Sequence, residues 1–239
     1  MYYNIPTIST YDTMYEFTVR DFIDWNKGYP DVNWSFNINF TDIYAMTDVK
    51  YLIFENYSND LENYLYWATP LALDNTSFYV MQVNDASFAR TVNSLVTEDE
   101  FNNTFDENAY FHEISNYLAN HYIVDNDTYD ALKDYPLANS IIYVDPDYLD
   151  NNSFVLNIDV DDDCLLFIAV PNNAGWEYKL NSNVIDTYKI QGGFTAIKLQ
   201  KGHNHIEANY NIPGINITSK VSIVTAIITL LMIIRRFKK

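Results

Sequence analysis

The sequence predicts an α+β fold: a mixed helix and strand region over residues 1–150, an antiparallel β-sandwich over 151–212, and one transmembrane helix over 215–234. Three observations support this prediction. Helical and β-type patterns mix in the first part, and short strands separated by turn residues follow in the second. An apolar run followed by four cations then ends the sequence. With 239 residues, the chain is long enough for one large domain or two small ones.

Helix and strand signals alternate in the first part. A capping box, Thr13-x-x-Glu16, precedes apolar residues at near-helical spacing and predicts a helix. β-Branched and aromatic residues predict strands over 49–54 and 77–83. Phe88, Thr91, Val92 and Leu95 have the spacing of a short amphipathic helix.

Two further stretches complete the first part. Glu98, Asp99 and Glu100 fit the first turn of a helix, where negative charge interacts favourably with the helix dipole. Residues 105–135 permit helices and strands alike, because Tyr and Ile dominate their apolar positions. We therefore expect a region of mixed elements rather than a bundle or a sheet.

The second part is entirely of β type. Cys164 to Val170 is apolar throughout, as in a strand buried on both faces. Trp176 alternates with Tyr178, so we expect the indole to pack between the two sheets. Turn residues punctuate the region every eight to twelve residues, which indicates a sandwich. The expected strands cover residues 154–158, 164–170, 176–180, 184–190, 194–199 and 205–210.

The apolar run near the end of the chain predicts a membrane anchor. No charge interrupts the residues from Val221 to Ile234, and counting from Ile217 gives about 18 residues, the lower limit for a span. Lys220 can extend its ammonium to the membrane interface while its stem stays in lipid. Arg235 and Arg236 begin the basic tail. A buried core helix is the alternative interpretation of this run.

Charge predicts how the anchor is oriented. The tail, residues 235–239, holds four of the 14 basic residues, which leaves ten basic and 32 acidic residues, a formal charge of −22, on the rest. Cations flank spans on the cytoplasmic side, so we expect a cell-membrane protein with one span in this chain, an extracytoplasmic bulk and a cytoplasmic C-terminus. The first residues show no export signal. The chain is therefore either the end of a longer membrane protein or a tail-anchored cytoplasmic protein.

Composition excludes several classes of protein. Hydrophobic residues form 48% of the chain and aromatic residues 16%, too many for a disordered tail. The formal charge of −18 argues against nucleic acid as a partner, because clustered Lys and Arg make phosphate contacts. The one cysteine, Cys164, can form no internal disulfide and supplies no zinc cluster. We expect no metal or other cofactor in this chain.

The end of the sequence resembles a known family. The motifs, in chain order, are Leu166-Phe-Ile-Ala-Val-Pro171, Gly175-Trp176, Gly193-Phe194, Lys201-Gly202, Tyr210 and Pro213-Gly214 followed by the apolar run. Their order and spacing resemble the C-terminal part of the YfhO family of bacterial membrane proteins. Upstream, Val49-Lys50-Tyr51 is similar to a strand of that family. The resemblance is specific over the last 60 residues and weaker before them.

The resemblance implies a membrane glycosyltransferase of the GT-C type. Such enzymes take sugar from a polyprenyl-phosphate carrier, and a cell-wall polymer such as teichoic acid is the expected acceptor. The family's catalytic acid lies in an early loop that nothing here matches, so we assign no catalytic residue. The implied partners are the lipid bilayer, the upstream membrane helices of the parent protein, and cell-wall polysaccharide or lipid-linked sugar. The alternative is a membrane-anchored carbohydrate-binding protein without enzymatic activity.

Three groups of side chains are candidate sites. Aromatic rings stack on sugar faces, and four of them lie in polar, loop-like contexts: Trp34, Tyr64, Tyr66 and Trp67. The acidic stretch Asp159 to Asp163 could bind Ca²⁺ but lacks an EF-hand pattern, so a solvated turn is favoured. His203 and His205 share one strand face and could hold a transition metal, although an exposed edge strand explains them without one.

Overall fold

A computed structural model describes residues 50–54, 68–71, 79–105, 117–118, 120–214 and 222–228. Several predictions lie outside these residues. They are the helix after Thr13, the four candidate sugar-binding aromatics (Trp34, Tyr64, Tyr66 and Trp67), and the anchor residues Lys220, Val221, Ile234, Arg235 and Arg236.

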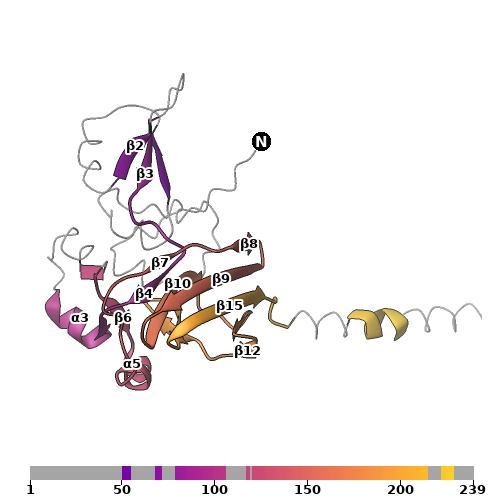
Figure 1. Ribbon diagram of the computed structural model, residues 1–239. Coiled ribbons are helices and arrows are strands. Elements are labelled where there is room, and N and C mark those ends of the chain that lie inside the picture. The colour runs from indigo at the N-terminus through magenta and orange to yellow at the C-terminus, as the bar shows by residue number, and fades with distance from the viewer. Residues whose placement is uncertain are drawn as a thin grey trace, which may run out of the picture.

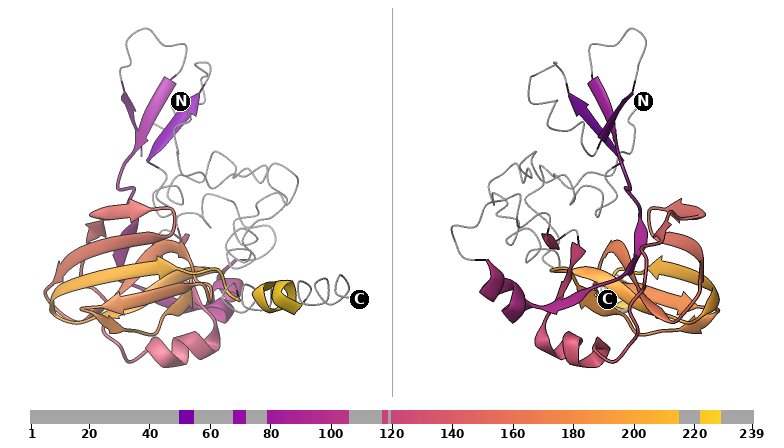
Figure 2. Two further views of the ribbon diagram at one scale, coloured as in Figure 1. Left: turned by 90° about the vertical axis from the view of Figure 1, so that its right-hand side faces the viewer. Right: turned by 60° about the vertical axis from the view of Figure 1, so that its left-hand side comes forward.

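A small antiparallel sheet stands away from the main body in Figures 1 and 2. It contains β1 (Tyr51–Phe54), β2 (Ala68–Leu71) and β3 (Tyr79–Val83) in the order β1-β3-β2. The strands expected over 49–54 and 77–83 are confirmed as β1 and β3, which pair from Tyr51↔Gln82 to Phe54↔Tyr79.

The main body is a sandwich of two five-stranded sheets (Figure 1). The first sheet has the order β13 (Tyr188–Ile190), β14 (Phe194–Leu199), β10 (Cys164–Pro171), β4 (Ala89–Val92) and β7 (Tyr143–Val144). The second has the order β12 (Asn183–Val184), β11 (Trp176–Leu180), β15 (Gly202–Tyr210), β9 (Ser153–Val160) and β8 (Tyr148–Asp150). Every strand pair within these two sheets is antiparallel. The expected β-rich second part is thereby confirmed.

Alternation of side chains builds the core between the sheets. Phe154, Leu156 and Ile158 of β9 are buried, while the side chains between them are half-buried or exposed. β10 is buried on both faces, as its continuous apolar sequence predicts. Leu166 belongs to the core between the two sheets, and Phe167 belongs to a second core on the outer side of the first sheet.

Two short helices and a strand pair cover this second core. β5 (Leu95–Thr97) and β6 (Tyr122–Val124) pair in parallel, next to α3 (Glu98–Thr104) and α5 (Asn126–Leu132). The expected acidic first turn is confirmed in α3, where Thr97 and Glu100 form a capping box. Residues 105–135, which were open to both interpretations, hold β6, α5 and a helical stretch at 117–118 and 120.

The amphipathic helix predicted from Phe88 to Leu95 is wrong. Residues 89–92 form β4, all four buried, between β10 and β7. Leu95 begins β5. A four-residue strand with both faces covered shows no alternation, so its apolar positions matched a helical spacing by chance. The strand expected over 184–190 is interrupted and forms β12 and β13 instead.

Residues 222–228 are helical and exposed (Figure 1). Their exposed residues include four large apolar ones: Ile223, Val224, Ile227 and Ile228. Within the residues that the structure describes, no helix has the length and hydropathy needed to cross a bilayer. The transmembrane helix over 215–234 stays a prediction.

Candidate functional site

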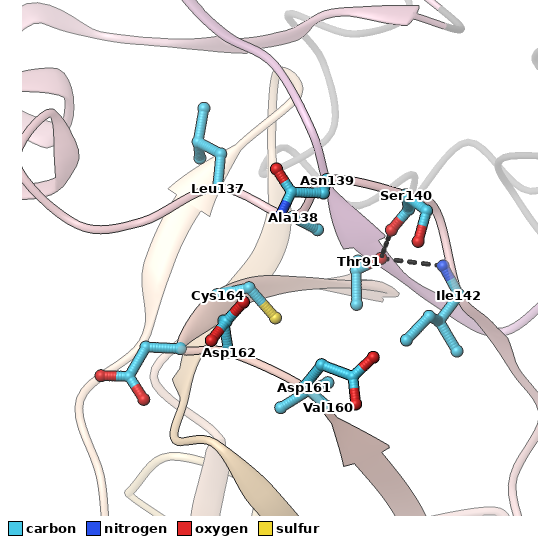
Figure 3. A pocket seen from close by; sticks show the side chains of 11 residues that line it. Thr91, Leu137, Ala138, Asn139, Ser140, Ile142, Val160, Asp161, Asp162 and Cys164 are labelled. Atoms are coloured by element: carbon cyan, nitrogen blue, oxygen red, sulfur yellow. Dashed lines mark hydrogen bonds between the residues drawn. The ribbon is translucent and has the colours of Figure 1, made fainter.

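A cavity of about 160 Å³ opens where β9 passes from one sheet to β10 in the other. Its lining side chains come from β4, from the connection between α5 and β7, and from the turn between β9 and β10 (Figure 3). The polar lining residues are Thr91, Asn139, Ser140, Asp161, Asp162 and Asp163. The apolar ones are Leu137, Ala138, Ile142, Val160 and Cys164.

Thr91 holds one wall of the cavity in place. Its hydroxyl donates to the Ser140 carbonyl at 3.0 Å and accepts from the Ile142 backbone N–H at 2.8 Å, as the dashed lines in Figure 3 show. The Ala138 N–H also donates to the Val92 carbonyl at 2.8 Å. Because both ends of the connection are bonded to β4, the Asn139 and Ser140 side chains are presented from a fixed backbone.

The opposite wall is the acidic turn. Asp163 Oδ1 accepts from the Lys201 backbone N–H at 2.8 Å, and Asp162 Oδ1 lies 3.3 Å from Lys201 Nζ. Both contacts tie the turn to the start of β15. No group of three metal-binding side chains occurs among the described residues. The turn is a hydrogen-bonded structural element whose carboxylates are exposed.

The thiol of Cys164 completes the floor of the cavity. Burial, together with the charges of Asp163 and Asp162, raises its pKa to about 11. The thiol is thus protonated at neutral pH and is a poor nucleophile. The chemistry that this cavity offers is hydrogen bonding: carboxylate oxygens that accept, and hydroxyl and amide groups that do both. Such a lining suits the hydroxyl groups of a small neutral ligand.

The two candidate histidines lie on the outer face of the second sheet. His203 Nδ1 is 3.1 Å from Asp159 Oδ1, and His205 Nδ1 is 2.7 Å from Asn157 Oδ1. The expectation of an edge strand is wrong, because β15 is the middle strand of its sheet. Polar partners on the neighbouring strand β9, rather than an open edge, explain why histidines occupy this face.

Trp176 packs at one end of the inter-sheet core, which confirms its expected structural role. Its ring centroid lies 5.5 Å from that of Phe154 and 5.3 Å from that of Tyr210. A Cβ atom on Gly175 would overlap the Tyr210 ring, so glycine is required for this packing. The Gly-Trp pair and the tyrosine of the sequence motif therefore form one contact where the chain leaves the sandwich.

Sequence reasoning missed most of the cavity. It identified Asp161 to Asp163 as a turn, but assigned Thr91 to a helix and gave no role to Asn139 or Ser140. These residues are far apart in sequence, and their neighbourhood depends on the pairing of β4 with β7 and β10. No local pattern marks such a site.

Comparisons with known proteins add a family relationship. Residues 143–222 match a family model described as "Bacterial membrane protein YfhO". The chain is 27% identical over 110 residues to "Uncharacterized protein YfhO" of Bacillus subtilis (strain 168), a match that covers 46% of this chain and 13% of the relative. No solved structure matches significantly.

Proposed function

The chain belongs to the YfhO family of bacterial membrane proteins through residues 143–222, and from this we propose that it forms the extracytoplasmic domain and last membrane helix of a YfhO-like membrane glycosyltransferase. The match to the relative covers a small part of that protein, so the remaining membrane helices and the catalytic loop belong to other parts of such an enzyme. The proposed donor is a polyprenyl-phosphate sugar and the proposed acceptor a cell-wall polymer such as teichoic acid.

One observation supports the proposal most directly: the family match runs through the sandwich and into the C-terminal apolar segment. It begins at β7, includes the whole second sheet and reaches residue 222, where the exposed apolar helix begins. An exposed helix whose large side chains are mostly apolar is unfavourable in water and favourable in lipid. The basic tail after it gives the orientation proposed here, with the sandwich outside and the C-terminus in the cytoplasm.

The cavity favours a second candidate function, a membrane-anchored carbohydrate-binding protein. Its carboxylates, amide and hydroxyls are the groups that bind sugar hydroxyls. Both functions place the sandwich against polysaccharide, and they differ in whether sugar transfer occurs. The purified chain should transfer no sugar from a polyprenyl-linked donor, and transfer by this chain alone would contradict the assignment of catalysis to other parts of the enzyme.

The membrane anchor can be tested with the full chain expressed in bacteria. We expect it in the membrane pellet. Because the proposed orientation depends on upstream helices of the parent protein, it is tested in spheroplasts of cells that carry that protein, where external protease should cleave the sandwich. The double substitution Val224→Asp and Ile228→Asp should move the chain to the supernatant, because each carboxylate in a spanning helix costs about 3 kcal/mol.

The matched control is Val184→Asp, which changes an exposed valine on the sandwich, 66% accessible, and should leave the chain in the pellet. Wild-type chain in the supernatant would refute the anchor. A sandwich that external protease leaves intact in the spheroplasts with the parent protein would refute the orientation while keeping the anchor.

A further inference from the structure

Arg90 is a buried cation in an acidic protein. Its side chain, only 4% exposed, lies in the middle of β4, with Phe167 of β10 on one side and Tyr143 of β7 on the other. Cross-strand partners share a face, and Phe167 belongs to the core under α3, α5 and β6. The guanidinium therefore lies beside that apolar core rather than in solvent.

Two nitrogens of this guanidinium are buried without any hydrogen-bond partner. They are Nε and Nη2, and the Tyr122 hydroxyl is a third such group. The Tyr122 side chain is fully buried in β6 and packs on Phe167, with ring centroids 5.3 Å apart. Burial raises the pKa of Tyr122, while the positive charge of Arg90 acts in the opposite direction. Arg90 is itself the cross-strand partner of Phe167, so both side chains adjoin the same ring. Arg90 and Tyr122 thus bring three unsatisfied hydrogen-bonding groups into one neighbourhood.

The identity of the two nitrogens indicates what would bind there. Nε and Nη2 form one edge of the planar guanidinium, the edge that donates two parallel N–H bonds to a carboxylate or phosphate. A buried charge left unpaired is strongly unfavourable, so proteins normally supply it with a counter-ion. No carboxylate of the described residues bonds to this edge, although the chain has 32 acidic residues.

We propose that the Nε and Nη2 edge of Arg90, together with the Tyr122 hydroxyl, is a binding site for an oxyanion, a carboxylate or a phosphate group. The Tyr143 ring packs against the guanidinium, with its centroid 5.5 Å from the guanidinium carbon, and the residue is 44% exposed, so an anion would enter from solvent on this side. The cation–π contact stabilises the guanidinium while the site is empty. This inference is independent of the proposed glycosyltransferase function.

The test is the melting temperature of the full chain titrated with sodium phosphate or sodium acetate at pH 7, against sodium chloride at equal ionic strength. Phosphate, acetate or both should raise Tm beyond chloride, with the concentration dependence of single-site binding. A response to acetate alone assigns a carboxylate, and a response to phosphate alone assigns a phosphate. Equal Tm values in all three salts would overturn the proposal, as expected if buried water fills the site.

Three variants locate the effect. Arg90→Met should abolish the excess rise in Tm, and Lys179→Met, which removes a half-buried lysine of the second sheet, should preserve it. Tyr122→Phe is the variant to use if Arg90→Met fails to fold. It should lower the affinity of the site for the anion about tenfold, because one hydrogen bond is lost. An undiminished response in Tyr122→Phe, or an equal response in Arg90→Met, would refute the site. The Nε–H nitrogen resonance of Arg90 should shift during the same titration.

Discussion

Single residues in this protein are constrained mainly by burial. The Cys164 thiol is 3% exposed between β9 and the cavity, and Gly175 leaves the space that Tyr210 fills. Gln191 is fully buried, and its side chain accepts from the Ile123 N–H at 2.8 Å and donates to the Leu118 carbonyl at 2.9 Å. Each of these residues depends on a neighbour that is distant in sequence.

The Cys164 thiol makes the free energy of unfolding depend on pH in the alkaline range. Its pKa rises from 9.0 in the unfolded chain to about 11 in the fold, so the folded state holds the thiol proton more tightly. The resulting stabilisation is fully present below pH 9 and is lost as the pH rises towards 11. We expect Tm to fall over this interval, and to fall less steeply in Cys164→Ala. An equally steep decline in Cys164→Ala would contradict the role of the thiol.

The short helix α3, in the layer outside the first sheet, is stabilised by the capping residues at its N-terminus. α3 has only seven residues, and its capping box satisfies two backbone N–H groups: Thr97 Oγ1 accepts from Glu100 N at 3.1 Å, and Glu100 Oε2 accepts from Thr97 N at 2.9 Å. So short a helix gains little from propagation and relies on its cap and on Phe101, which is buried.

We therefore expect Thr97→Ala to lower the free energy of unfolding by about 1 kcal/mol. Chemical denaturation of the full chain measures this change. Glu100→Gln is the matched control and should cost less, since Gln retains the hydrogen bond to the Thr97 backbone. A Thr97→Ala variant as stable as the wild-type protein would contradict the role of the capping box in stabilising α3.

β4 shows the limit of assigning helices and strands from local sequence patterns. Strong local patterns, such as the alternation in β9 and the apolar run of β10, were predicted correctly because each shows a period or a length that one element type explains. β4 has four residues, all buried. Its conformation follows from its pairing with β10 and β7. Both strands lie far from Phe88 in the sequence, so a local sequence pattern does not reveal the pairing.

Charge acts on the molecule as a whole. The formal charge of −18 produces mutual repulsion in the folded state, and salt screens it. Raising NaCl from low to moderate concentration should therefore stabilise the fold, and each kcal/mol gained raises Tm by about 2–4 °C for a domain of this size. Thermal unfolding of the full chain at several NaCl concentrations tests this. An uncharged osmolyte at equal osmolality is the control, and a Tm that stays constant or falls with NaCl would contradict the repulsion.

The sequence by itself determined the β-rich second part, the acidic turn, the first turn of α3 and the family resemblance, because these depend on neighbours along the chain. Only the tertiary structure decided that β4 is a strand and that Thr91, Asn139 and Asp161 share a cavity. It also brought Arg90 and Tyr122 together beside one apolar core. The physical reason is that the strand pairing of β4 joins segments about 50 to 80 residues apart through backbone hydrogen bonds, and these bonds leave no periodic mark in the sequence.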